Sequence, residues 1–229
     1  MSDQPTIVLG IETAGTGGSL ALLREGQLLA ERVLEVTGRR HAQTLVAELA
    51  RLCDEVAIPA RGIGLVAISI GPGSFTGLRV GCTLAKTLCY ATGAKLVAVD
   101  SLLASATAWS GEHSRVWAIE DAQRGEVFLG EYHRTPEGFE RRGEITIVKA
   151  AAWLEPLSPG DVVLGPGLSR TQTLPTSAIR IEASMAPPPA RIVAELGTKA
   201  AARGEFADPW TIEPFYLRLS AAEEKAAKG

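Results

Sequence analysis

Residues 69–88 read SIGPGSFTGLRVGCTLAKTL, a glycine-rich loop that follows a strand-like run and leads into a helical pattern. The run before it, GLVAISI, is apolar without alternation, which is typical of a strand buried on both faces. In open α/β sheets, ligands usually lie at the carboxyl ends of such strands. The stretch therefore predicts an α/β fold and makes this loop the first candidate site.

Two roles fit the loop. A helix amino end carries roughly half a positive charge and free N–H groups, so the loop could hold a phosphate. The candidate phosphate contacts are Gly71, Gly73, Ser74 and Thr76. A Walker loop would need a lysine followed by Ser or Thr, and a dinucleotide loop would need G-x-G-x-x-G; neither follows the strand. The pattern also fits a tight turn in which the glycines serve backbone geometry, and we favour that role.

The helix after the loop carries a ridge of small residues. Gly77, Gly81 and Ala85 follow one another at four-residue spacing, so they share one face of the helix. Such a ridge lets another backbone approach closely. It either packs inside the chain, against the sheet, or contacts a second subunit, and both alternatives stay open at this point.

Strands and helical patterns alternate around this stretch. Two strand-like segments flank a turn at Glu25 and Gly26, and a helical pattern covers residues 41–58. AKLVAVD at residues 94–100 supplies another buried strand. A hairpin followed by strands joined by helices predicts a mixed sheet with helices on its faces.

The second half of the chain repeats the first in outline. VWAIEDAQRGEVFLGEY can be laid against IVLGIETAGTGGSLALL, and further on DVVLGPG echoes AISIGPG. Two matches in the same order indicate an internal duplication. The predicted parts are a first lobe at residues 1–105, a second lobe at residues 106–208 and a C-terminal tail helix at residues 209–229.

Composition limits the class of partner and the compartment. The 229 residues carry a net charge of −3 with no basic stripe, which disfavours strong direct binding to nucleic acid. Cys53, Cys82 and Cys89 form no C-x-x-C pair, and an odd set fits a reducing compartment. Because no stretch approaches eighteen continuous apolar residues, we expect a soluble cytoplasmic protein without a membrane segment.

A convincing set of reacting groups is missing. His41, His113 and His133 form no H-E-x-x-H pair, and we interpret each as a surface or capping histidine. Four carboxylates follow strands and could hold magnesium; they are Glu12, Asp100, Glu120 and Asp121. We favour turn capping for these carboxylates.

Five motifs together resemble one family, TsaB, also called YeaZ. They are GIETAGTGGSLALL, SIGPGSFTGLRVGCTLAKTL, KLVAVDSLLA, EDAQRGEVFLGEY and EPFYLRLSAAEE, in order from residue 10 to about residue 224. The resemblance implies a duplicated actin-like or Hsp70-like (ASKHA) α/β fold, with two mixed-sheet lobes and flanking helices.

The resemblance also implies a function. TsaB proteins are accessory subunits that bind and activate the catalytic paralogue TsaD, which works with the ATPase TsaE to make threonylcarbamoyladenosine next to the anticodon of tRNA. They also form homodimers. The resemblance implies that this chain meets tRNA through the complex and needs no cofactor of its own, apart from weak ATP or ADP binding at the subunit interface.

TsaD proteins carry an H-x-x-x-H metal pair after the strand that follows the G-P-G helix. At the corresponding positions this chain has Asp100, then Ser101 and Ser105, and two hydroxyls cannot replace two imidazoles on a transition metal. The resemblance therefore implies no metal and no catalytic activity of the chain alone. A stand-alone ATP-dependent kinase or ATPase, and a metallopeptidase, remain the alternatives. Glu12 stands where many members have Asp, which weakens the case for magnesium-ATP.

On this resemblance we expect the helix after the loop to be the pairing face for TsaD or for a second copy. The expected contacts are Gly77, Arg79, Gly81 and Ala85. The loop from Gly71 to Thr76 would then be a vestige of a phosphate site.

Overall fold

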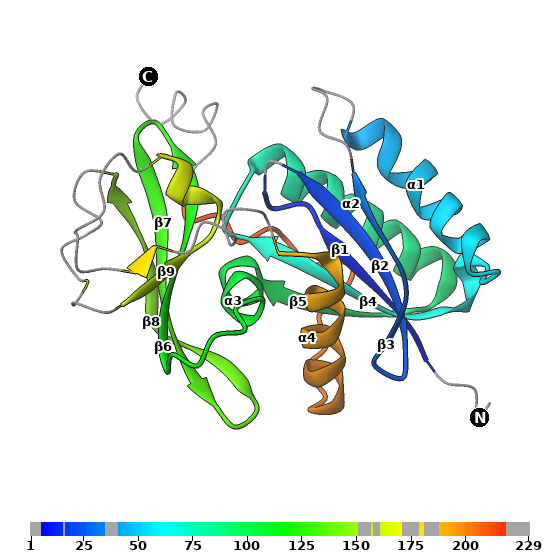
Figure 1. The fold of residues 1–229 in the computed structure, drawn as a ribbon. Coiled ribbons are helices and arrows are strands. Elements are labelled where there is room, and N and C mark those ends of the chain that lie inside the picture. The colour runs from blue at the N-terminus through cyan, green and yellow to red at the C-terminus, as the bar shows by residue number, and fades with distance from the viewer. Residues whose placement is uncertain are drawn as a thin grey trace, which may run out of the picture.

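The computed structural model describes residues 6–15, 17–34, 41–150, 157, 161–170, 179–180 and 188–218. Within these residues the chain forms two five-stranded sheets that lie side by side, each with helices against it (Figure 1). The sheet built from residues 7–100 belongs to the first lobe, and the sheet built from residues 115–180 belongs to the second lobe.

The first sheet has the strand order β3-β2-β1-β4-β5. Its strands are β1 (Ile7–Glu12), β2 (Gly18–Arg24), β3 (Gln27–Leu34), β4 (Ile63–Gly71) and β5 (Lys95–Asp100). Glu25 and Gly26, with φ of 52° and 76°, form the tight turn between β2 and β3 that the sequence predicted. β1 is antiparallel to β2 and parallel to β4, so the sheet is mixed.

Two helices, α1 (His41–Glu55) and α2 (Phe75–Thr92), cover one face of the first sheet (Figure 1). Leu9 and Ile11 point to this face and join one buried core with Leu49 and Cys82. Alternate residues of a strand point to opposite faces, so Val8 lies in a different core on the other side. Both faces of β1 are therefore covered, as its continuous apolar pattern requires.

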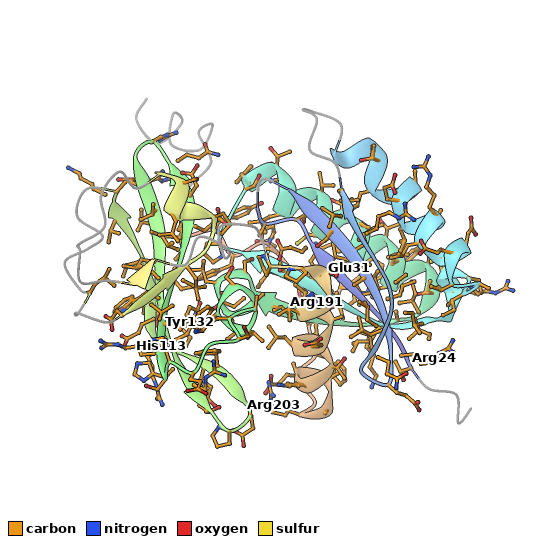
Figure 2. The ribbon with its side chains drawn as sticks, in the orientation of Figure 1. Arg24, Glu31, His113, Tyr132, Arg191 and Arg203 are labelled. Carbon is orange, nitrogen blue, oxygen red and sulfur yellow. The ribbon has the colours of Figure 1, made fainter. Side chains whose placement is uncertain are left out.

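The other face of the first sheet is covered by α4 (Ala190–Ala202), which comes after the second lobe in sequence. The helix lies so close to β1 that a Cβ on Gly10 would be 2.1 Å from the carbonyl oxygen of Ala190. The N–H of Arg191 donates to Oε1 of Glu31 over 3.0 Å, and Figure 2 shows these two residues on the facing elements. The predicted second lobe at residues 106–208 is corrected accordingly, because α4 packs with the first lobe.

The second sheet has the strand order β10-β9-β6-β7-β8. Its strands are β6 (Arg115–Gln123), β7 (Glu126–Thr135), β8 (Gly138–Lys149), β9 (Val162–Leu164) and β10 (Ile179–Arg180). Read from β8 to β10, this order matches that of the first sheet read from β3 to β5, so that β6 corresponds to β1. Like β1, β6 is antiparallel to one neighbour, β7, and parallel to the other, β9. The repeated topology confirms the internal duplication and the two mixed-sheet lobes of an actin-like fold.

Short helices complete the described fold: η2 (Ala60–Gly62), α3 (Ser101–Thr107) and η3 (Pro166–Arg170). α3 lies between the sheets, and its Leu102 joins the core of the second lobe together with Val116 (Figure 1). Across the lobes, the hydroxyl of Tyr132 donates to Oδ2 of Asp100 over 2.9 Å.

After α4 the chain returns along the first lobe. The N–H of Ala207 donates to the carbonyl of Leu96 on β5 over 2.8 Å, and Ile212 is buried in the α1–α2 core. Residues 205–218 contain no helix, and the remainder of the predicted tail helix lies outside the described residues. Among the helices that the structure describes, none combines the length and the apolarity needed to cross a membrane.

Candidate functional site

The G-P-G loop at the end of β4 is held by three hydrogen bonds. The N–H of Gly71, whose φ is +117°, donates to Oγ of Ser101 over 2.9 Å. The N–H of Ser74 donates to the carbonyl of Ala14 over 2.6 Å, and Oγ of Ser74 caps α2 by accepting from the N–H of Gly77 at 3.3 Å. The loop is thus joined to the turn after β1 and to the start of α3.

The glycines of the loop allow close approach of two backbones. A Cβ on Gly73 would lie 2.3 Å from the carbonyl oxygen of Ala14, and one on Gly77 would lie 2.0 Å from that of Thr13. Real Cβ atoms do not come so close to a carbonyl oxygen, so only glycine fits. The contacts are those of the tight turn that we favoured, and phosphate binding at this loop remains a prediction.

The ridge of small residues on α2 faces the interior. Gly81 is buried, Ala85 is 0% exposed, and a Cβ on Gly81 would lie 2.3 Å from Oγ1 of Thr13. The expectation that Gly77, Gly81 and Ala85 contact a partner is therefore corrected, because these residues pack against the sheet of their own lobe. Of the four expected contacts, Arg79 alone is exposed.

The outward face of α2 forms a depression with α1, which we call the outer groove. It encloses about 330 Å³ and is lined by Leu45, Val46, Arg79, Val80, Thr83, Leu84 and Thr87. The side chain of Val46 is 61% exposed. At the far end of α2, Tyr90 and Trp210 are 75% and 73% exposed and meet edge to face at 5.3 Å. Exposed large apolar side chains that gather on one part of a surface are typical of a site that binds another protein.

A second hollow, the interlobe cavity, has a volume of about 450 Å³. It lies between the start of α2, the turn from β6 to β7, and residues 213–218, which we call the strap. In the strap, the ring of Tyr216 stacks on Phe75 with 4.8 Å between centroids. Nη1 of Arg218 donates to the carbonyl of Ala122 over 2.7 Å. The strap thus forms one wall of the cavity and contacts both lobes.

Two buried carboxyl groups occupy equivalent positions in the two lobes. Glu12, at the end of β1, accepts hydrogen bonds from the N–H of Ala14 at 2.6 Å and from the hydroxyl of Ser69. Glu120 accepts from the N–H of Asp121 at 2.9 Å. Burial raises the pKa of Glu12 to about 7 and the pKa of Glu120 to about 8, and the nearby charge of Glu12 adds to the rise at Glu120.

The other two candidate carboxylates also accept from the main chain. Oδ1 of Asp100 accepts from the N–H groups of Leu102 and Leu103, which caps α3. Oδ1 of Asp121 accepts from the N–H of Gln123 at 2.7 Å. All four carboxylates that could hold magnesium are thus engaged in the capping bonds that we favoured.

The raised pKa values predict that stability falls as pH rises. Above the ordinary pKa of 4.5 the unfolded chain ionises Glu12 and Glu120, whereas the folded chain keeps both protonated until pH 7 to 8. Stability is therefore fully present below about pH 4.5 and declines up to about pH 8, by on the order of 3 kcal/mol for each group. Urea unfolding between pH 5 and 8 measures this slope.

The matched variant is Glu12→Gln, because the amide resembles the protonated acid and cannot ionise. We expect it to remove about half of the decline with pH, whereas Glu25→Gln at the exposed β2–β3 turn leaves the slope as in the parent chain. An equal slope in the Glu12→Gln variant and the parent chain would contradict the assignment.

Ser101 and Ser105, which the resemblance matched to the TsaD histidines, have structural roles. Ser101 holds the G-P-G loop through Gly71, and the hydroxyl of Ser105 donates to the carbonyl of Ser101 over 3.2 Å. Within the described residues, no group of three or more His, Cys, Asp or Glu side chains could hold a metal ion. Both serine hydroxyls are thus engaged in hydrogen bonds within the fold.

The structure describes the side chains of two of the three histidines. His113 is exposed at the periphery of the second lobe (Figure 2), and Nε2 of His133 lies 2.6 Å from Oε1 of Glu131. The side chain of His41 lies outside the described residues. The three cysteines are buried, and burial raises the pKa of Cys82 and of Cys89 to about 11, so these two thiols are poor nucleophiles at neutral pH.

Sequence reasoning missed the outer groove and the strap. Val46, Tyr90 and Trp210 lie in patterns that also suit a core, so their exposure could not be deduced. The signal for the strap was EPFYLR, in which Pro214 precedes two aromatic residues, although this motif falls within the predicted tail helix at residues 209–229. We quoted this motif without assigning it a contact.

The sequence of this chain is similar to those of known proteins. The sequence model of the family described as "TsaD: tRNA N6-adenosine threonylcarbamoyltransferase" matches residues 33–208. A protein of Bacillus subtilis named "tRNA threonylcarbamoyladenosine biosynthesis protein TsaB" is 31% identical over 95% of this chain and 96% of its own length. The protein of the same name from Escherichia coli is 32% identical over 57% of each chain.

Solved structures agree with the sequence matches. The structure titled "YeaZ from Pseudomonas aeruginosa" superposes with a TM-score of 0.77 at 27% identity, over 93% of this chain and all of the other. The two structures therefore share the fold of Figure 1 over most of this chain.

Proposed function

Since the chain belongs to the TsaB family, we propose that it is the non-catalytic subunit that binds and activates TsaD in the synthesis of tRNA threonylcarbamoyladenosine. Its relatives carry the name of that biosynthesis. TsaE is the proposed third component of the complex. With a net charge of −3, this chain meets tRNA through its partners.

The observation that carries the proposal is the outer groove. It combines an apolar floor with exposed side chains on the outward faces of α1 and α2, and a partner helix pair would fill it. The family model that describes TsaD matches residues 33–208, which include both helices, and this match supports an equivalent helix pair in TsaD. Two proteins of one fold can pair through equivalent surfaces, and a second copy of this chain can occupy the same groove.

The non-catalytic role is supported by what the buried side chains do. Ser101 and Ser105 make hydrogen bonds within the fold, and the carboxyl groups of Glu12 and Asp100 cap neighbouring N–H groups. These four side chains thus stabilise the fold through hydrogen bonds. We therefore propose that the transfer of the threonylcarbamoyl group takes place on TsaD.

Reconstitution tests the proposal. Purified TsaD, TsaE, threonylcarbamoyl-adenylate synthase and tRNA are incubated with and without this chain, and modified adenosine is measured by mass spectrometry. We expect modification to accumulate only in the presence of this chain. Equal yields in both mixtures would end the proposal.

A further inference from the structure

The strap connects the lobes through a short run of contacts. The N–H of Phe215 donates to the carbonyl of Ile70 in the first lobe over 2.7 Å. Leu217 packs against the core of the second lobe, and Arg218 pairs with Glu126 there. Residues 213–218, drawn in orange to red in Figure 1, therefore cross from one lobe to the other.

Arg79 is the residue that links the strap to the outer groove. Its Nε donates to the hydroxyl of Tyr216 over 3.0 Å, and its Cζ lies 3.9 Å above the centre of the Phe75 ring. The same side chain lines both the interlobe cavity and the outer groove. Among the described residues that line the outer groove, Arg79 alone carries a charge.

A partner that covers the outer groove removes water from this guanidinium group. A buried cation that is left without an anionic partner is strongly destabilising. A carboxylate stabilises a buried guanidinium group better than a phenol oxygen and the face of an aromatic ring do. Hydrogen bonds that involve ionised groups are roughly twice as strong as those between neutral groups. The groove therefore suits a partner surface with an acidic side chain opposite Arg79.

We infer that docking of such a partner draws Arg79 away from Tyr216 and so releases the strap from the first lobe. The inference rests on the proposed function, since TsaD is the partner that docks. Arg79 is then a positioning residue whose guanidinium is either on the strap or on the partner carboxylate. Docking in the outer groove and the hydrogen bond between Arg79 and Tyr216 become alternatives.

Hydrogen exchange measured by mass spectrometry tests this coupling. The reporter is the peptide of residues 213–218, which contains the N–H of Phe215. We expect its exchange to accelerate about tenfold when TsaD is added to the parent chain, the size expected for losing one hydrogen bond to a charged group. Size-exclusion chromatography of the same samples shows whether the complex has formed.

Two conservative variants separate the hydrogen bond from the stacking. Tyr216→Phe keeps the ring on Phe75 but removes the acceptor for Arg79. Its strap should exchange about tenfold faster in the free chain, with no further increase on adding TsaD. The control is Thr198→Val on α4, which also removes one hydroxyl that bonds within the fold but lines neither the interlobe cavity nor the outer groove, and it should behave as the parent chain.

The outcomes distinguish the two proposals. Strap exchange that is unchanged or slower in a formed complex overturns the coupling and leaves the proposed function intact. So does a Tyr216→Phe strap that exchanges as slowly as the parent strap in the free chain. If chromatography shows no complex with TsaD, the proposed function and the coupling both fall.

Discussion

A Gly77→Ala variant should lose about 3 kcal/mol of folding stability, because the added methyl group meets main chain. Its Cβ would lie 2.0 Å from the carbonyl oxygen of Thr13, and that oxygen belongs to the turn after β1, which cannot rotate away as a side chain could. The ~1 kcal/mol that alanine gains over glycine within a helix is too small to offset the clash. Thermal unfolding should begin about 10 °C lower for a chain of this length.

The control is Gly62→Ala in η2, where the nearest atom to the new Cβ is Cγ2 of Ile58 at an ordinary 3.4 Å. We expect its stability to stay within about 0.5 kcal/mol of the parent chain. A Gly77→Ala variant as stable as Gly62→Ala would show that the turn after β1 yields easily and that the close packing is incidental.

A Val46→Arg variant should bind TsaD about a hundredfold more weakly, because it places a second cation in the outer groove beside Arg79. Burying this unpaired charge under a partner costs about 3 kcal/mol. Val46 is 61% exposed, so the fold itself should be unaffected. Calorimetric titration with TsaD measures the affinity, and unfolding of the free variant checks the fold.

The matched control is Val33→Arg, the same exchange at a valine that is 75% exposed on β3 and does not line the outer groove. It should bind TsaD as the parent chain does. Equal affinities for the two variants would remove the outer groove from the interface.

Much of the first lobe could be predicted from the sequence, because its signals are local. The turn at Glu25 and Gly26 and the continuous apolar run of β4 are each settled by neighbours in the chain. The duplication could also be predicted, since equivalent strands keep similar residues, as Glu12 and Glu120 show.

The direction in which α2 faces could not be predicted. A row of small residues allows close approach to a sheet or to a partner, and the spacing of Gly77, Gly81 and Ala85 is the same in both cases. What decides it is the carbonyl of Thr13, which lies far away in sequence and fills the space above the helix. The placement of α4 was wrong for a similar reason, because its pattern of apolar residues does not indicate which sheet it covers.

That placement of α4 affects how the molecule emerges during synthesis. The ribosome delivers β1 to β5 long before residues 190–202, so one apolar side of the first sheet, around Val8 and Ala67, is not covered by α4 until those residues have been made. Folding of the first lobe is thus complete only after α4 has been synthesised. A polypeptide that is truncated before α4 has an exposed apolar surface on the first sheet.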